Sequence, residues 1–103
     1  MTDVADILNA AADLLEPEGA WTKGALARDR RGHTVDYASP NAVRWCVGGA
    51  ILAVSPGKRP LRGQALRALE GYLDVVLSTS WNDSQPTVEP VLAALRGAAE
   101  AAS

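Results

Sequence analysis

The sequence contains no phenylalanine, and cysteine, histidine and methionine occur only once each. An apolar core made of Ala, Leu and Val suits close-packed helices better than a sandwich of aromatic strands. A single cysteine forms no internal disulfide, so nothing in the composition indicates an oxidising compartment. No apolar run approaches the roughly 18 residues that cross a bilayer, and the acidic amino-terminal segment is unlike a secretory signal. We therefore expect a cytoplasmic protein.

The usual signatures of catalysis and cofactor binding are also missing. The sequence has no glycine-rich phosphate loop, no group of closely spaced metal ligands and no Ser/His/Asp arrangement. We accordingly expect no metal, no cofactor and no enzymatic activity.

What the sequence does contain is enough apolar residues for one globular domain. Hydrophobic residues make up 48% of the 103 positions, which predicts a single domain over residues 1–103. The net charge of −2 is unevenly distributed: residues 1–21 carry −5, residues 22–67 carry +7 and residues 68–103 carry −4. Such blocks indicate either a solvated surface in which acidic and basic elements face each other or a basic surface for an anionic partner.

Apolar residues at helical spacing predict a mainly α fold, a compact four-helix domain with a small β-hairpin between the first two helices. The predicted helices cover about residues 4–15, 40–54, 61–77 and 88–102. Ser39 and Pro40 have the residue types of a helix start, so the second helix is expected to begin there. Residues 24–29 and 33–37, on either side of a turn that ends in Gly32, predict the hairpin.

The segment WCVGGA, residues 45–50, lies inside the predicted second helix and raises the question of a reactive thiol. Cys46 would need a nearby base, and the only histidine is His33 on the hairpin. Free cysteine is commonly buried, and paired glycines in a helix indicate a close approach by another backbone. We therefore predict a structural core and a packing seam against a neighbouring helix. This core comprises Trp45, Cys46, Gly48, Gly49 and Ala50.

The sequence Trp81-Asn82-Asp83 lies in a polar stretch that is predicted to be a loop. It has two interpretations: an anchored loop in which Trp81 fills an apolar gap, or a recognition spot for another protein. We further expect Trp81 and Trp45 to converge near the two glycines, with Trp21 as a candidate third member.

A set of cations in the middle of the chain is the candidate surface for an anionic partner. The set comprises Arg28, Arg30, Arg31, Lys58, Arg59 and Arg62. If the hairpin tip lay beside the start of the third helix, these side chains could contact phosphates as one patch. The pI of about 5.2 and the lack of a helix-turn-helix or zinc-finger signature count against nucleic acid as the main partner.

Four short motifs follow one another along the chain: an EP pair after the first helix, A-x-D-x-x-G at 27–32, W-C-x-x-G-A at 45–50 and W-N-D at 81–83. Their order resembles that of a family of small uncharacterised bacterial and phage proteins, classed as a domain of unknown function. The resemblance covers almost the whole chain and implies a compact domain, often phage-encoded, with no established activity. The family pattern singles out Asp29, Trp45, Cys46, Gly49, Ala50, Trp81, Asn82 and Asp83. The chain departs from it after Asp83, where Ser-Gln-Pro-Thr replaces an expected Pro-Gly-Arg-Thr turn.

The leading hypothesis is a small non-enzymatic interaction domain, encoded by a phage or mobile element, that binds a host or phage protein. Trp81, Asn82, Asp83 and Asp29 are its candidate protein-binding residues. The alternatives are a nucleic-acid-associated protein that uses the basic segment 22–67, and an enzyme that depends on Cys46. The identity of the partner and the oligomeric state stay open.

Overall fold

Five helices and a short two-stranded sheet form the fold in the computed structural model, which describes residues 3–57 and 59–103. The elements in chain order are α1 (Val4–Leu15), β1 (Ala27–Arg28), β2 (Arg44–Trp45), α2 (Val47–Ala53), α3 (Arg59–Leu73), α4 (Ser78–Asp83) and α5 (Glu89–Ala102). The mainly helical class is confirmed, and so is the presence of a small antiparallel sheet. The predicted count of four helices omitted α4.

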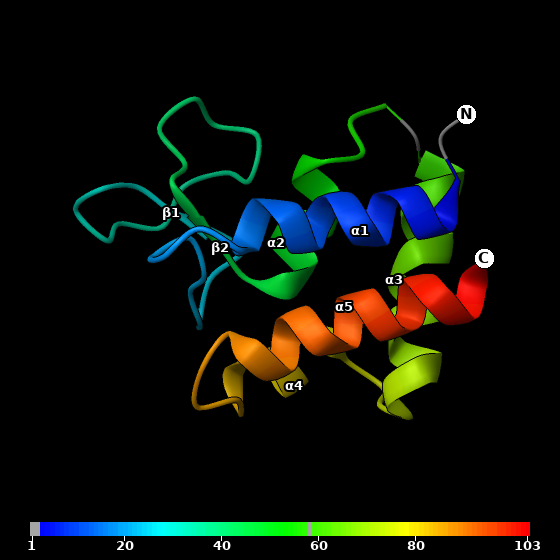
Figure 1. Cartoon of the computed structure of the whole chain (residues 1–103). Coiled ribbons are helices and arrows are strands. Elements are labelled where there is room, and N and C mark those ends of the chain that lie inside the picture. The colour runs from blue at the N-terminus through cyan, green and yellow to red at the C-terminus, as the bar shows by residue number, and fades with distance from the viewer. Residues whose placement is uncertain (1–2, 58) are drawn as a thin grey trace.

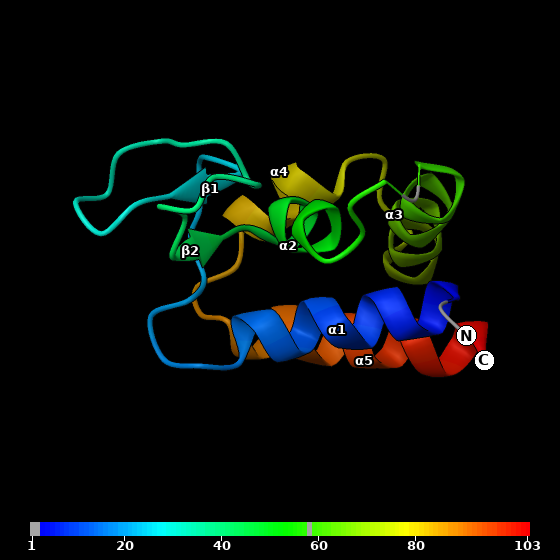
Figure 2. The same cartoon turned by 90° about the horizontal axis from the view of Figure 1, so that it is seen from above.

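The elements form two layers (Figures 1 and 2). Helices α1 and α5 lie side by side and antiparallel in one layer, so the end of α5 lies near the start of α1. The second layer holds the sheet, α4, α2 and α3, with α3 crossing α1 steeply at the end away from the sheet. No helix in the described ranges has the length and apolar character needed to cross a membrane.

The core lies between these two layers and is made of small and aliphatic side chains. Helix α1 begins with a capping box, in which the side chains of Asp3 and Asp6 each accept the other residue's backbone N–H. One face of α1 is then buried against all the larger helices. The fully buried side chains of this core include Leu8, Leu15, Val47, Ile51, Leu69, Val91 and Leu95.

The predicted helix over 40–54 is wrong in its first half, because α2 begins only at Val47. The backbone before it is extended and takes part in pairing with earlier segments: Val43 N–H donates to the carbonyl of Arg28, and Trp45 N–H to that of Ala20. These partners lie far away in the sequence, so the local helix-start residues could not reveal them. Ser39 and Pro40 instead lie in a turn.

The predicted hairpin is correct in its turn and wrong in its main strand pairing. A backbone bond from Asp29 N–H to the His33 carbonyl closes the turn, and Gly32 takes a positive φ of 84°. The strand before the turn, β1, pairs with β2 rather than with 33–37, which contributes a single bridge at Thr34. The pairing with β2 places residues 20–46, which we call the irregular region, against the start of α2.

Helix α3 ends at Leu73, four residues earlier than predicted, because Asp74 takes a left-handed conformation with φ of 56°. Asp74 N–H bonds to the Gly71 carbonyl and Val75 N–H to the Glu70 carbonyl, which is the Schellman pattern of helix termination. The chain then turns into α4, whose first residue, Ser78, donates its N–H to the Glu70 carboxylate at 3.0 Å. Residues 74–77 are thereby removed from the apolar stripe of α3.

Candidate functional site

Asn82 is at the centre of the Trp-Asn-Asp motif, and it is fully buried. Its Oδ1 accepts the indole N–H of Trp21 at 2.7 Å and the backbone N–H of Val47 at 3.0 Å. Its Nδ2 donates to the Thr22 carbonyl at 3.1 Å and to Asp83 Oδ1 at 3.2 Å. All four hydrogen-bonding positions of the amide are therefore used within the chain. Asn82 holds the 21–24 segment, α2 and α4 together, and it presents no polar group to a partner.

Asp83 extends this arrangement to the surface. It is exposed, and its Oδ1 accepts the backbone N–H of Gly24 at 3.0 Å. The turn that follows is fixed in a similar way, since the side chains of Ser84 and Gln85 both donate to the Trp81 carbonyl. The motif was predicted to be a loop, but it forms the second half of α4. The helix was not predicted because the group that caps it, Glu70, belongs to a different helix.

The close approach predicted at the paired glycines is present, but the partner is different. A Cβ on Gly49 would overlap the carbonyl group of Leu26, which belongs to the segment before β1 and not to a helix. A Cβ on Gly48 would lie 3.2 Å from Thr79 of α4. Residues 46–50 are buried, and the two glycines among them lie between Leu26 and α4.

Cys46 is at the N-cap of α2, where its Sγ accepts the N–H of Gly49 at 3.3 Å. The residue is 2% exposed, and burial raises the pKa of its thiol above the ordinary value. The geometry pairs His33 with Asp29 at 3.8 Å, and no hydrogen bond joins His33 to Cys46 among the described residues. A buried neutral thiol with this role is a poor nucleophile at neutral pH.

All three tryptophans pack against the core, and a backbone bridge joins two of them, Trp21 and Trp45. Trp45 also donates its indole N–H to the Tyr37 carbonyl at 3.2 Å. Asn82 joins both bridged tryptophans to the Trp-Asn-Asp motif. It accepts the indole N–H of Trp21 directly, and it accepts the backbone N–H of Val47, two residues after Trp45. Trp81 instead borders a hollow on the side of α4 near α3.

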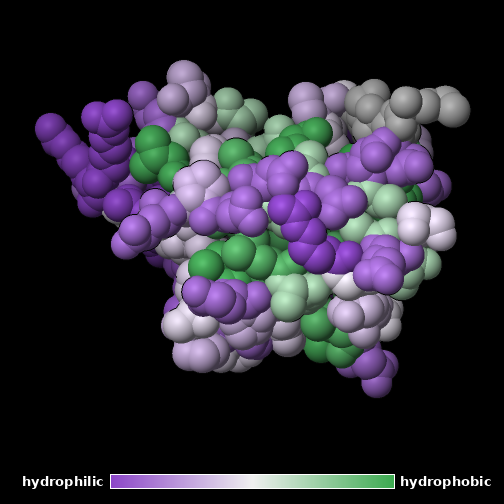
Figure 3. Space-filling view, in the orientation of Figure 1, coloured by the Kyte–Doolittle hydropathy of each residue, from purple (hydrophilic) through white to green (hydrophobic). Residues whose placement is uncertain are grey.

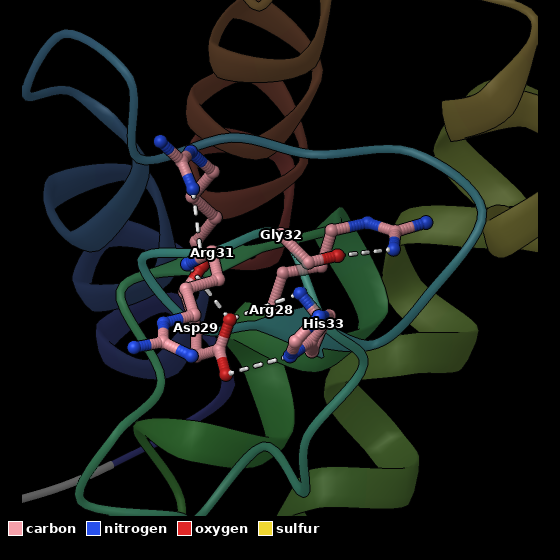
Figure 4. Close-up of polar contacts among 6 residues, drawn as sticks. Arg28, Asp29, Arg31, Gly32 and His33 are labelled. Carbon is pink, nitrogen blue, oxygen red and sulfur yellow. Dashed lines mark hydrogen bonds and ion pairs between the residues drawn. The ribbon is translucent and has the colours of Figure 1, made fainter.

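Asp29 organises the hairpin turn from within (Figure 4). Its Oδ1 accepts the backbone N–H groups of Arg31 and His33, each at 2.9 Å. These bonds favour the charged form and lower the pKa of the carboxyl group. Arg28 closes the turn from the other side by donating to the Gly32 carbonyl at 2.9 Å. Asp29 therefore holds the turn in one shape, and its side chain is directed toward the chain's own backbone.

The six cations predicted as one anionic-partner patch are divided by the structure. Arg28 donates to three groups of its own segment, and Arg62 donates to the Ser55 carbonyl at 2.9 Å and contacts Tyr37. Arg30 and Arg31 are exposed at the hairpin tip, whereas Arg59 begins α3 at the opposite end of the molecule in both views (Figures 1 and 2). Lys58 lies outside the described residues. Arg30 and Arg31 are thus separated from the cations of α3.

An apolar surface beside Trp81 was not predicted from the sequence. Val75, Val76, Leu77, Ser80 and Trp81 line a hollow of about 410 Å³. Val76 is 88% exposed and Leu77 58% exposed, although both lie within the range predicted for the third helix, 61–77. The signal that could have revealed this is Asp74, a residue type that tolerates the left-handed conformation at a helix end.

The remaining chemistry of the described residues is limited. Nowhere in 3–57 and 59–103 do three His, Cys, Asp or Glu side chains come together as a metal site. Of the ion pairs in these ranges, one joins His33 to Asp29 within the hairpin turn, and two join Arg96 of α5 to Asp13 and Glu16; none joins residues 22–67 to the acidic segments 3–21 and 68–103.

Comparisons with known proteins agree with the family resemblance at the level of the whole chain. No curated protein and no solved structure matches it. One family model does match, over residues 1–101, and it describes a family of unknown function. Because the match spans nearly the entire sequence, the chain belongs to this family of unknown function, DUF6197.

Proposed function

We propose that this chain is a small interaction domain that binds another protein through the apolar surface beside α4. We define this surface as Val75, Val76, Leu77 and Trp81, the apolar residues that line the hollow. The observation that carries the proposal is the exposure of apolar side chains there. Two of the four large hydrophobic side chains that are exposed among the described residues, Val76 and Leu77, line the hollow.

The physical argument is that grouped exposed apolar side chains gain free energy when a partner covers them. Single exposed hydrophobic residues are common on soluble proteins, but a contiguous group around a hollow is typical of an interaction site. Trp81 is half-buried at the edge of this hollow, where a fixed aromatic ring offers a large contact area at little entropic cost.

The fold supports this surface with a rigid base. The Glu70 carboxylate caps α4 through Ser78, and Asn82 fixes the other end of α4 to α2. A surface held at both ends loses little conformational freedom on binding, which favours affinity. Asn82 thus supports the proposed interaction from the interior, while Trp81 takes part in it directly.

The proposal places this interaction in the cytoplasm of a bacterial cell, with a host or phage protein as the partner. The lone cysteine supports an unoxidised compartment, and the motif resemblance supports a phage or mobile-element origin. A search for the partner should therefore use the lysate of a bacterial cell.

The experiment compares wild type with Val76→Asp in affinity capture from a bacterial lysate, followed by titration of the purified partner. Val76 is 88% exposed, so the substitution should leave the fold intact, while a charge in an apolar interface should weaken binding by about tenfold or more. The matched control is Ala93→Asp, which adds the same charge at an exposed position of α5 and should leave affinity unchanged. Equal binding by wild type and Val76→Asp, or a wild type that captures no protein, would count against the proposal.

A further inference from the structure

A second hollow, of about 380 Å³, lies between the hairpin turn and the segment that leads into β2. Its lining residues are Asp29, Arg30, Arg31, Pro40, Asn41 and Val43. The volume falls within the range of small-molecule sites, and the lining combines cationic, amide and apolar groups. Strongly hydrophilic side chains project from this end of the molecule in Figure 3. The hollow therefore has the composition of a site for an anion.

The positive charge in this hollow is not neutralised within the chain. Arg30 and Arg31 are exposed, and neither guanidinium has a carboxylate within 4.0 Å among the residues that the structure describes. Among the described residues, neither side chain makes a hydrogen bond. The backbone N–H of Arg31 donates to Asp29 Oδ1. The guanidinium groups of Arg30 and Arg31, which line the same hollow, thus keep all their donors available to a ligand.

The one acid in the lining, Asp29, is engaged chiefly by the backbone of its own turn, and the charge of Arg31 acts on it as a smaller effect. Both backbone bonds to Asp29 Oδ1 come from the turn itself, and Oδ2 lies 3.8 Å from Nδ1 of His33. The N–H dipoles stabilise this carboxylate in its charged form, and the charges of Arg30 and Arg31 exceed its single negative charge, so the lining keeps a net positive charge.

The turn that carries Arg30 and Arg31 is fixed before a ligand arrives. Arg44 donates to the Asp29 carbonyl at 3.1 Å, and Arg28 donates to the Gly32 carbonyl at 2.9 Å. These two guanidinium groups hold the base of the turn and add positive charge behind it. A preformed cationic turn reduces the entropy that binding must overcome.

We propose that this hollow binds a phosphate ester, with Arg30 and Arg31 donating to the phosphate oxygens. A phosphate group has up to two negative charges and three free oxygens, which suits two adjacent guanidinium groups better than a carboxylate does. Asn41 supplies a neutral hydrogen-bonding group, while Pro40 and Val43 give an apolar wall for the rest of the ligand. The phosphate can belong to a free nucleotide or to a nucleic-acid backbone; both offer anionic phosphate oxygens, three on a monoester and two on a diester. This site is separate from the apolar surface beside α4 and does not depend on the proposed protein interaction.

The test is a titration of ¹⁵N-labelled protein at low salt with three probes: pyrophosphate, ADP and a short single-stranded oligonucleotide. Saturable shifts of the amide signals of residues 30–33 and 41–43 are expected. The double variant Arg30→Gln/Arg31→Gln should lower affinity about tenfold or more, because it removes the charge-assisted hydrogen bonds to the phosphate oxygens. Both side chains are exposed, so the melting temperature should stay unchanged.

The matched control is Arg59→Gln/Arg67→Gln, which removes the same charge from exposed positions of α3 and should leave affinity within about twofold, as expected for distant charges screened by salt. Binding of pyrophosphate or ADP identifies a free phosphate ester as the ligand source, and binding of the oligonucleotide alone identifies a nucleic-acid backbone. The proposal is overturned if none of the probes shifts these amides. It is equally overturned if both double variants weaken binding to the same extent, since the effect would then be one of net charge.

Discussion

Helices α1 and α5 meet through buried Leu and Ala side chains, whereas residues 20–46 meet α2 and α4 mainly through directed hydrogen bonds. In the helical region, Leu8, Leu15 and Leu95 are completely buried among other apolar groups. Where residues 20–46 meet α2 and α4, the amide of Asn82 in α4 makes four hydrogen bonds, and the guanidinium of Arg28 makes three within its own segment.

The two kinds of contact differ in how much they specify. Apolar packing depends on volume and tolerates exchange between side chains of similar size. A buried hydrogen-bond network depends on the direction of each donor and acceptor, and loss of one member leaves its partners unsatisfied. Both candidate surfaces adjoin the hydrogen-bonded region, so the precise placement of Trp81 and of the hairpin arginines depends on this network.

The largest expected effect is that of Asn82→Ala. The substitution leaves the Trp21 indole N–H, the Val47 N–H and the Thr22 carbonyl without their buried partner. At about 1–3 kcal/mol for each unsatisfied group, with partial relaxation, we expect a loss of about 4 kcal/mol in the free energy of unfolding. Urea denaturation followed by circular dichroism measures it.

Leu8→Met is the matched exchange in the helical region, because Leu8 is equally buried and methionine has a similar volume. It should cost less than about 1.5 kcal/mol. If Asn82→Ala cost no more than Leu8→Met, the contrast between the two regions would be incorrect.

The second largest effect is expected for Gly49→Ala. A Cβ at this position would collide with the Leu26 carbonyl, whose carbon atom lies only 2.8 Å from the added atom. Because backbone rather than a flexible side chain must move, we expect a loss of about 2–3 kcal/mol, in the range of overpacked cores. Thermal unfolding by calorimetry would record it as a lower melting temperature.

Gly71→Ala provides the control for Gly49→Ala. Gly71 lies in α3, and a Cβ there would meet nothing within 4 Å. The same substitution should therefore stabilise the protein by about 0.5–1 kcal/mol through helix propensity. A loss of stability in both variants would show that helical glycines are required for some reason other than the contact with Leu26.

The smallest effect is expected for Asp29→Asn, and it depends on pH. The pKa of Asp29 is lower in the folded state than its ordinary value of 3.8, because the backbone N–H groups of His33 and Arg31 stabilise the carboxylate. This contribution to stability is present above pH 3.8 and is lost as the pH falls through the lowered pKa. Wild type should therefore be more stable than Asp29→Asn at pH 7, and the difference should shrink in acid. Urea denaturation of both proteins at pH 7 and at a pH below 3.8 tests this. A difference in the free energy of unfolding that did not change with pH would contradict it.

How much the sequence predicts depends on whether an element's partners are near in the sequence. The stripe and the acidic cap of α1 and the start of α5 near Pro90 depend on residues within one or two turns, and both helices lie where periodicity placed them. The turn over residues 29–33 was also predictable, because Gly32 and Asp29 act on their immediate neighbours. The capping of α4 by Glu70 joins residues in different helices, so the Trp-Asn-Asp segment looked like a loop.

The candidate surfaces illustrate the same limit. The sequence identified Trp81, Arg30 and Arg31 as residues able to contact a partner, because their chemistry is evident from residue type. It did not predict that Asn82 would be buried, that Arg62 would be held by Ser55, or that Val76 would be exposed.

The sequence by itself determined the helical class, the small-residue core and the close approach at Gly49, since each follows from residue type and local spacing. Only the tertiary structure decided what approaches Gly49, which strand pairs with β1 and which cations stay unpaired. Those outcomes depend on hydrogen bonds between residues far apart in the chain, such as the bond from Val47 N–H to Asn82 across 35 positions. A long-range bond of this kind leaves no periodic signal in the sequence, because its geometry exists only after both segments have packed against the same core.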